Sequence, residues 1–420
     1  MARIVLKFGG TSVGDTDRIK NVARKVKAEV DRGNQVAVVV SAMSGATNQL
    51  VKWVNEIAPL HDAREYDVVV ATGEQVTIGL LAMALQQLGV NARSYVSWQI
   101  PIKTDAAYAK ARIQSIETGD LVDRMVAGEV PIVPGFQGIS PEGRITTLGR
   151  GGSDTTAVAV AAALNADVCE IYTDVDGVFT ADPRIVPNAR KIDEITYEEM
   201  LELAACGAKV LMLRCVEYAR RFDLPIHVRS SYSNNPGTIV TGSMEALKVE
   251  QALITGVAHD RSEAKITVVG VPDEPGEAAL IFETVAAADT NIDMIVQNIS
   301  TEGSGRTDIS FTLPTSDGPA AMAALGKQQD KLGFKSLLFD DHIGKVSLIG
   351  AGMRSHPGVA AKFFGALAAA GVNIEMISTS EIRVSVVCRD TDLDSAVRAV
   401  HDAFALGSDE QAVVYGGTGR

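Results

Sequence analysis

The residues whose types and spacing are best suited to binding or catalysis form a glycine-rich loop at 149–154, with the sequence Gly-Arg-Gly-Gly-Ser-Asp. A short β-branched strand at 145–148 precedes this loop, and an apolar, alanine-rich segment at 157–164 continues it as a helix. Glycines let backbone N–H groups approach an anion closely, and a helix N-terminus adds a partial positive charge. Arg150 contributes a full charge, and the serine and aspartate that end the loop are suited to the helix N-cap. The stretch predicts an anion-binding turn, although an ordinary strand-to-helix turn explains one such loop equally well.

Two other polar loops follow predicted strands. Lys7 stands near the end of a strand at 3–8 and precedes two glycines. A lone lysine at a strand end is usually solvated, but together with Arg150 and Asp154 it could hold the phosphates of a nucleotide and an acidic substrate. The loop at 173–184 is placed to cover that nucleotide. A plain turn-rich connection is an equally good explanation of this third loop from its composition alone.

Apolar strands that alternate with helices predict an α/β fold, with a mostly parallel sheet covered by helices on both faces. Strands are expected at 3–8, 35–40, 92–96, 130–133, 145–148, 168–173 and 225–228, and helices at 17–31, 47–57 and 74–88. The last of these helices is expected to bury Val76, Leu80, Leu81, Ala84 and Leu88. Ligands of such sheets bind outside the carboxyl ends of the strands. Lys7, Ser41 and the loop at 149–154 should therefore gather on one rim.

Composition and motif content exclude several classes of protein. At 420 residues with 46% hydrophobic content, the chain should form two or three soluble domains. Its formal net charge of −13 argues against a nucleic-acid or anionic-membrane partner. Four cysteines without C-x-x-C spacing indicate reduced thiols, and no signal peptide or apolar run close to a membrane span is expected, which places the protein in the cytoplasm. The histidines form no metal-binding pair, and the glycine loop is neither a Walker A motif nor a dinucleotide-binding turn.

The region after the turn-rich segment 230–242 contains an internal repeat. Residues 264–270 match 344–350, and residues 291–295 match 373–377. Each copy predicts a βαββαβ pattern that ends in a short strand. Duplicated small modules behind a domain that carries chemistry suggest ligand-sensing units.

Five segments in order along the chain resemble the signatures of the bacterial aspartokinase family. They are 7–13 (KFGGTSV), 41–44 (SAMS), 71–75 (ATGEQ), 147–156 (TLGRGGSDTT) and 172–178 (YTDVDGV). The repeat resembles the pair of ACT domains of that family, and no dehydrogenase segment follows it, as in the monofunctional form regulated by lysine and threonine. The resemblance implies an amino-acid-kinase-type sheet sandwiched by helices in residues 1–245, followed by two ferredoxin-like ACT modules. The modules are expected at 262–342 and 343–420, the second completed by a strand from 250–261.

The resemblance also implies the reaction of ATP, with Mg²⁺, and L-aspartate to ADP and 4-phospho-L-aspartate, the first step of lysine, threonine, methionine and diaminopimelate biosynthesis. Catalysis would rest on Lys7 and on Asp154, which orients the lysine. Residues expected to bind aspartate are Ser41, Thr47, Glu74, Arg150, Gly151, Gly152 and Ser153, with Arg150 on a carboxylate and Glu74 on the α-ammonium. Residues expected to bind ATP are Lys7, Phe8, Gly9, Gly10, Ser41, Thr173, Asp174, Phe179, Asp182, Arg184 and Lys209. No side chain is assigned to the metal.

The same resemblance implies feedback control by threonine and lysine through the repeat. The residues expected to bind these effectors are Asp273, Asn291, Ile292, Asp293, Gln297, Met353, Arg354, Asn373, Ile374 and Glu381. Each of them could equally well cap a helix or a turn. A homo-oligomer, or an assembly with a separately translated tail that starts at Met244, is expected through the modules.

Two other functions remain open from the sequence. One is an amino-acid kinase of the same fold that acts on glutamate, acetylglutamate or carbamate, since the fold alone does not separate these substrates. The signature at 7–13 together with the two tail modules favours aspartate. The other is a non-catalytic amino-acid sensor with a dead front domain, against which the intact Lys7, Arg150 and Asp154 argue.

Overall fold

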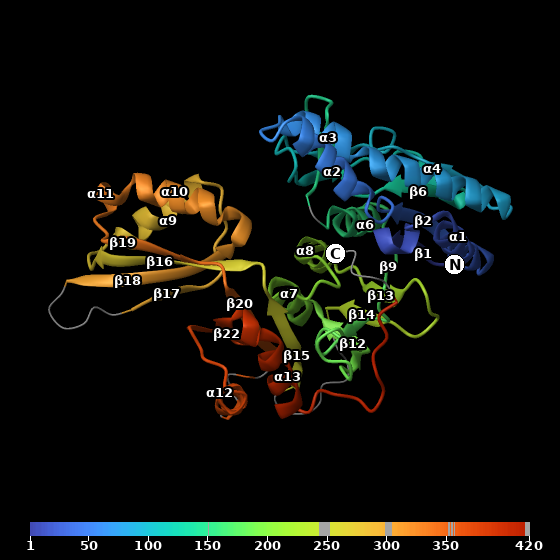
Figure 1. The fold of residues 1–420 in the computed structure, drawn as a ribbon. Helices are drawn as coiled ribbons and strands as arrows, with labels where there is room; N and C mark the ends of the chain where they lie inside the picture. The colour runs from blue at the N-terminus through green and yellow to red at the C-terminus, as the bar shows by residue number, and fades with distance from the viewer. Residues whose placement is uncertain are drawn as a thin grey trace.

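The computed structural model describes residues 1–149, 151–242, 253–298, 305–351, 353, 356 and 358–415. An α/β domain at one end of the molecule is followed by two smaller α/β modules (Figure 1). Arg150, Arg354 and Met244, to which the sequence assigns roles, lie outside the described residues. The four cysteines are buried as free thiols, in keeping with the expectation from their spacing.

The first domain is built on an eight-stranded sheet of order β12-β14-β13-β9-β1-β2-β6-β3. Its strands are β1 (Arg3–Phe8), β2 (Gln35–Val40), β3 (Ala92–Ser94), β6 (Val130–Pro134), β9 (Val168–Thr173), β12 (Glu194–Thr196), β13 (Ile226–Ser230) and β14 (Thr238–Thr241). The pairs are parallel except β13–β14, so the carboxyl ends of β9, β1, β2 and β6 share one rim. The expected mostly parallel sheet is confirmed.

Helices cover both faces of this sheet. They are α1 (Thr16–Asp31), α2 (Ala46–Ile57), α3 (Ala63–Val70), α4 (Thr72–Gln87), α5 (Leu121–Val126), α6 (Gly152–Ala163), α7 (Tyr197–Ala205) and α8 (Leu213–Phe222). Ile4, Leu6 and Phe8 of β1 pack with α1 and α4, whereas Val5 packs with α6 and α8. Successive side chains of a strand point to opposite faces, so Lys7 shares the α6 face with Val5.

Two sequence expectations about these elements are wrong. Strand β8 (Ile145–Thr147) pairs antiparallel with β7 (Gln137–Ile139) in a small separate sheet, completed by β4 (Ile102–Thr104) and β5 (Ile113–Ile116), and does not join the main sheet. Helix α4 buries Ile78, Leu81, Ala82 and Leu85, while Val76 is 55% exposed. This helix is apolar nearly all round, so the pattern did not identify its buried face.

One helical stretch reaches the length and composition of a membrane span, which the sequence pattern did not lead us to expect. Residues Ala63–Gln87 form a 25-residue helical stretch with a mean hydropathy of 1.7, the single such stretch in the described part of the chain. Half of the apolar window is buried inside the protein, and core helices of soluble proteins meet the same two criteria.

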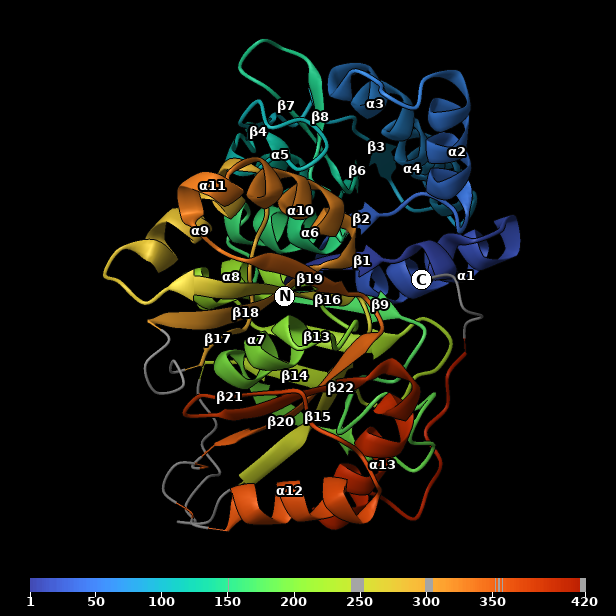
Figure 2. The same cartoon turned by 60° about the vertical axis from the view of Figure 1, so that its left-hand side comes forward.

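The repeat forms two four-stranded antiparallel sheets, each covered by helices (Figure 2). The first has the order β17-β18-β16-β19, with strands β16 (Glu263–Pro272), β17 (Ile295–Gln297), β18 (Arg306–Pro314) and β19 (Ser336–Asp340), and helices α9 (Glu277–Ala287), α10 (Gly318–Lys327) and α11 (Gln329–Leu332). The second has the order β15-β20-β22-β21, with strands β15 (Leu253–Asp260), β20 (Ile343–Ala351), β21 (Met376–Thr379) and β22 (Arg383–Arg389), and helices α12 (Val359–Ala369) and α13 (Leu393–Ala403).

Strand β15 pairs with β20 in the position that β19 occupies beside β16 in the first module. The short final strand expected in the second copy does not pair with that sheet among the described residues, and β15 takes its place. The second module is therefore completed by a strand that precedes the first module in the sequence.

Candidate active site

A buried ion pair joins the sheet to the helix that follows the glycine loop. The Nζ atom of Lys7, on β1, contacts Oδ1 of Asp154, in the first turn of α6. Both side chains are at most 7% exposed. Burying two charges is tolerated because each neutralises the other, and the contact fixes the position of the ammonium group. A Cβ atom at Gly9 would lie 3.4 Å from this ammonium, so the glycine keeps the space beside it open.

The glycine loop has the backbone conformation that its sequence predicts. Gly149 and Gly151 have φ angles of +77° and +73°, a region that favours glycine. A Cβ atom at Gly151 would also lie 2.0 Å from Cγ of Met212, so any side chain there would clash. Helix α6 begins at Gly152, and its N-cap is Gly151, which has a left-handed conformation. The expectation that Ser153 and Asp154 form the N-cap is therefore wrong, and both lie in the first turn.

A buried carboxylate that the sequence did not reveal supports this loop. Asp67, on α3, is fully buried and accepts hydrogen bonds from the N–H and the hydroxyl of Thr147, at 2.9 and 2.6 Å. It also accepts one from the N–H of Ala109. These bonds hold the chain just before Gly149. An aspartate in a short helix is usually exposed to solvent, so nothing in the sequence indicated that Asp67 is buried and supports the loop.

Glu74 lies at the same rim, in the first turn of α4. A Cβ atom at Gly73 would lie 2.7 Å from Cβ of Ala42, so glycine lets α4 approach the chain after β2 closely. The backbone N–H of Ala42 donates to Oε1 of Glu74 at 3.0 Å, whereas Oε2 has no hydrogen-bond partner in the described part of the chain. Burial raises the pKa of Glu74 to about 7. An unpaired buried carboxylate of this kind is suited to receive a ligand cation.

The other residues expected to bind aspartate lie close to these two features. Ser41 follows β2 directly, and its N–H donates to the carbonyl of Phe8. Thr47 is half-buried in the first turn of α2. Ser153 packs against the end of β6, since a Cβ atom at Gly135 would lie 2.5 Å from its Oγ. The described residues that were expected to bind aspartate therefore lie along this rim.

A pocket opens at the end of β9 and contains six of the residues expected to bind ATP. They are Thr173, Asp174, Phe179, Asp182, Arg184 and Lys209. Arg184 lies 3.5 Å from Asp174 and is half exposed, so positive charge is available locally in an acidic protein. Gly9 and Gly10 lie on the neighbouring strand end, where the N–H of Gly9 donates to the carbonyl of Tyr172. The side chain of Phe8 stacks on Tyr172 beneath α1, so its backbone alone borders the site.

One wall of the pocket was not foreseen from the sequence. Val257, Ala258 and His259 of β15 line it, next to the loop that carries Phe179 and Arg184. Burial lowers the pKa of His259. Because β15 belongs to the sheet of the second module, the pocket is shared between the first domain and that module.

The residues expected to bind effectors divide into exposed and packed groups. Asp273, Asn291, Gln297, Asn373 and Glu381 are exposed, whereas Met353 is buried and Ile292 and Ile374 are partly buried in the hydrophobic cores of their modules. Packing accounts for these last three side chains, whereas the alternative offered by the sequence was that they cap a helix or a turn.

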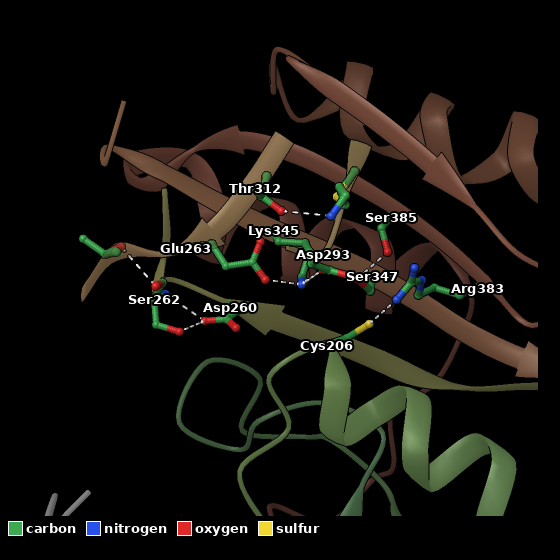
Figure 3. Close-up of polar contacts among 12 residues, drawn as sticks. Cys206, Asp260, Ser262, Glu263, Asp293, Thr312, Lys345, Ser347, Arg383 and Ser385 are labelled. Carbon is green, nitrogen blue, oxygen red and sulfur yellow. Dashed lines mark hydrogen bonds and ion pairs between the residues drawn. The ribbon is translucent and has the colours of Figure 1, made fainter. Parts of the chain in front are cut away.

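Asp293 has a partner across the two modules. Its carboxylate and that of Glu263 contact Nζ of the buried Lys345, which lies on β20 (Figure 3). Lys345 is 1% exposed, and its two carboxylate partners raise its pKa against the effect of burial. The three charges link the two sheets, so Asp293 has a structural contact besides any ligand that it binds.

Comparison with known proteins agrees with this geometry. The Amino acid kinase family profile matches residues 2–230, and the ACT domain profile matches residues 266–329 and 346–404. Aspartokinase of Mycolicibacterium smegmatis is 58% identical over the full length of both chains, and aspartokinase of Pseudomonas aeruginosa is 52% identical over 97% of this chain and 98% of its own. The chain belongs to the aspartokinase family. It is accordingly a phosphotransferase with a carboxyl-group acceptor, an aspartate kinase.

Solved structures show the same fold. Escherichia coli aspartokinase III in complex with aspartate and ADP, in the R-state, matches with a TM-score of 0.82 and 26% identity, over 96% of this chain and 99% of its own. The same enzyme in complex with lysine and aspartate, in the T-state, matches with a TM-score of 0.70 over 95% of this chain and 98% of its own. The fold class expected from the sequence, an amino-acid-kinase domain followed by ACT modules, is confirmed.

Proposed function

We propose that aspartate and ATP meet at Lys7, between the Glu74 carboxylate and the pocket at the end of β9. The buried Lys7–Asp154 ion pair is the observation that carries this proposal. Strand β1, which bears Lys7, lies between β2 and β9. The chain that follows β2 contacts Glu74 through the N–H of Ala42, and β9 leads into the pocket. The relative from E. coli that was solved in complex with aspartate and ADP supports a site for each of these two ligands.

The chemistry requires charge neutralisation more than proton transfer. The side-chain carboxylate of aspartate is ionised near neutral pH and needs no general base. Its approach to the γ-phosphate is opposed, since two unit charges about 4 Å apart repel by roughly 4 kcal/mol at an effective dielectric constant near 20. Lys7 would offset this repulsion, and Asp154 would keep its ammonium in place while charge moves between the substrates. Backbone N–H groups of the glycine loop would hold a substrate anion.

Glu74 and the pocket residues would position the two substrates. The unpaired Oε2 of Glu74 would accept from the α-ammonium of aspartate, and Arg150 would bind a carboxylate. In the pocket, Arg184 and Lys209 supply cationic groups for phosphates, and Phe179 supplies an apolar surface. Mg²⁺ would be held chiefly by phosphate oxygens of ATP, and no side chain is assigned to it. When bound there, the metal would neutralise phosphate charge.

A hydroxylamine trap tests this assignment. With ATP, Mg²⁺ and aspartate, the acyl phosphate should appear as a hydroxamate, and Asp154→Asn should lower kcat by orders of magnitude. Lys7→Ala should do the same. Lys103→Ala, which removes an exposed ion pair with Glu117, is the matched control and should retain activity. Turnover with glutamate and none with aspartate would refute the choice of substrate.

We further propose that this reaction opens lysine, threonine, methionine and diaminopimelate biosynthesis, with threonine and lysine as feedback inhibitors acting on the ACT modules. The exposed Asp273 and Gln297 leave polar groups available to an amino-acid ligand. The E. coli relative solved with lysine and aspartate in its T-state supports an amino-acid effector. Inhibition requires the effector to bind the less active arrangement more tightly.

Inhibition curves test the effector site. Asp273→Ala or Gln297→Ala should weaken inhibition by threonine, alone or with lysine, and leave uninhibited turnover nearly unchanged. A side chain that only caps a turn would lower the melting temperature and leave inhibition as it was. Asp330→Ala, on the short helix α11 of the same module, serves as the control.

Assembly through the modules is part of the same proposal. Ile295 on β17, at one edge of the first sheet, and Leu338 on β19, at its other edge, are 53% and 59% exposed. Exposed apolar side chains on edge strands favour pairing with another chain. We expect a homo-oligomer or an assembly with a tail-only subunit. Light scattering that shows a monomer at micromolar concentration would refute it, and intact-mass analysis would reveal a short subunit.

A further inference from the structure

The loop that lines the nucleotide pocket is anchored by a residue of the second ACT module. Thr180 directly follows Phe179 and lies within the stretch that carries Asp182 and Arg184. Its Oγ1 lies 3.0 Å from Nε2 of His401, on α13, although 221 residues separate the two in sequence. Both residues are buried, Thr180 at 1% and His401 at 0% exposure. Neither has a role in the phosphoryl transfer described above.

The hydroxyl of Thr180 uses its full hydrogen-bonding capacity. It donates to the carbonyl of Leu406 at 3.0 Å and accepts from the N–H of Arg190 at 3.0 Å. A hydroxyl has one proton to donate, so His401 must donate its Nε2–H to Thr180 as the second bond that the oxygen accepts. Burial lowers the pKa of His401, in keeping with a neutral ring. The arrangement therefore requires one tautomer and one position of the side chain.

The backbone around Thr180 is held from the other side by β15. The N–H of Val257 donates to the carbonyl of Thr180 at 2.7 Å. A Cβ atom at Gly256 would lie 2.7 Å from the same carbonyl oxygen, so the strand and the loop are in close contact. Val257 also lines the pocket itself.

The segment after α13 extends this attachment. It turns back along the first domain (Figures 1 and 2), where the N–H of Ala412 donates to the carbonyl of Pro187 and the N–H of Tyr415 to that of Asp174. Asp174 and Pro187 lie on either side of Thr180 in the sequence. The loop is thus fixed at its start, middle and end by residues of the second module and its tail.

We propose that His401 and Thr180 are positioning residues for ATP: their hydrogen bond holds the loop that presents Phe179, Asp182 and Arg184 to the nucleotide. The inference rests on the proposed role of this pocket as the ATP site. Loss of the bond would leave buried polar groups unpaired and let the loop move away from its binding geometry. The KM for ATP would then rise, whereas aspartate, bound at the other side of Lys7, would keep its KM.

Paired substitutions test the proposal. Thr180→Val keeps the shape and removes the hydroxyl, whereas Thr180→Ser keeps the hydroxyl. His401→Leu removes the ring donor, whereas His401→Gln offers an amide N–H in a similar position. We expect Thr180→Val and His401→Leu to raise the KM for ATP about tenfold with the KM for aspartate unchanged, and the Ser and Gln variants to lie near wild type. Each variant is assayed well below its own melting temperature, so that a loss of stability alone does not lower activity.

Two further results separate the possible failures. If Thr180→Val and His401→Leu keep the wild-type KM for ATP, or change the KM values of both substrates and kcat alike, the positioning role is refuted. Arg184→Ala, which alters the pocket directly, tests the underlying assignment. If it leaves the KM for ATP unchanged, the pocket is not the ATP site and the proposed function fails at this point, independently of His401.

Discussion

Substitution of Glu74 by glutamine should separate binding of aspartate from the stability of the fold. The carboxylate is 3% exposed, receives one hydrogen bond from Ala42 and leaves Oε2 unpaired in the described part of the chain. Glutamine has nearly the same shape but no charge to pair with an α-ammonium. A hydrogen bond to a charged group contributes about 1.5–3 kcal/mol, so the KM for aspartate should rise roughly 10- to 150-fold with little change in the KM for ATP.

The KM for aspartate should depend on pH because the pKa of Glu74 is raised, to about 7 in the free protein. Its ionised fraction falls from about one half at pH 7 to about one eleventh at pH 6, so the KM for aspartate should rise about fivefold over that interval. The ammonium and carboxylates of aspartate do not titrate there. Glu74→Gln should abolish this part of the pH profile, because the amide does not titrate.

The stability of the fold should decrease as pH rises, whereas binding of aspartate should strengthen. The folded-state pKa lies above the ordinary value of 4.5 for a glutamate side chain, so the free energy of unfolding of the wild-type protein falls as pH rises from about 4.5 to about 7. Glutamine avoids this penalty, which reaches about 3 kcal/mol at pH 8 because the folded-state pKa is about 7 rather than 4.5. Thermal unfolding at pH 5 and pH 8 measures the difference, with the exposed Glu56→Gln as control. An unchanged aspartate KM in Glu74→Gln at every pH would refute the placement of the ammonium.

Three other substitutions test contacts that support the site and the link between the two modules. Gly151→Ala should lower kcat/KM about a hundredfold because the loop must move, whereas Gly79→Ala, in α4 with open space around its Cβ, should be close to neutral in a parallel assay. Asp67→Ala should lower the free energy of unfolding by about 1–3 kcal/mol and reduce activity, since the bonds before the glycine loop are lost; equal stability in urea denaturation would contradict this. Lys345→Met should cost about 3–5 kcal/mol by leaving two carboxylates unpaired between the modules, and an unchanged denaturation midpoint would show that the cluster is not stabilising.

Local periodicity was sufficient to predict the strand that carries Lys7. Ile4, Leu6 and Phe8 alternate with Val5 and Lys7, which places the lysine on the face opposite the phenylalanine, as found. The glycine loop was likewise predictable, because a positive φ at Gly149 and Gly151 demands glycine. In both cases a short-range rule determines the geometry.

Partners distant in sequence were not predictable in this way. The strand at Ile145–Thr147 was recognised, but periodicity does not say which sheet a strand joins. The N-cap was misplaced by two residues or more because the left-handed conformation of Gly151 competes with the usual preference for serine and aspartate. Asp67 and His401 gave no signal, since a charged or polar residue on a helix is most often solvated.

Strand β15 connects the first domain to the second module, although it lies between the first domain and the first module in the sequence. It follows the first domain in the sequence, pairs with β20 of the second module and lines the pocket at the end of β9. The kinase family profile ends at residue 230, before this strand begins, so the matched segment lacks one wall of the pocket. A displacement of the second sheet would carry β15 with it, because ladder hydrogen bonds hold the strand to β20 along most of its length. The contact of Thr180 with both Val257 and His401 would transmit the same movement to the loop that carries Phe179 and Arg184. An effector bound to the modules, as proposed, would therefore have a direct physical route to the pocket at the end of β9, through backbone and side-chain bonds that the two share.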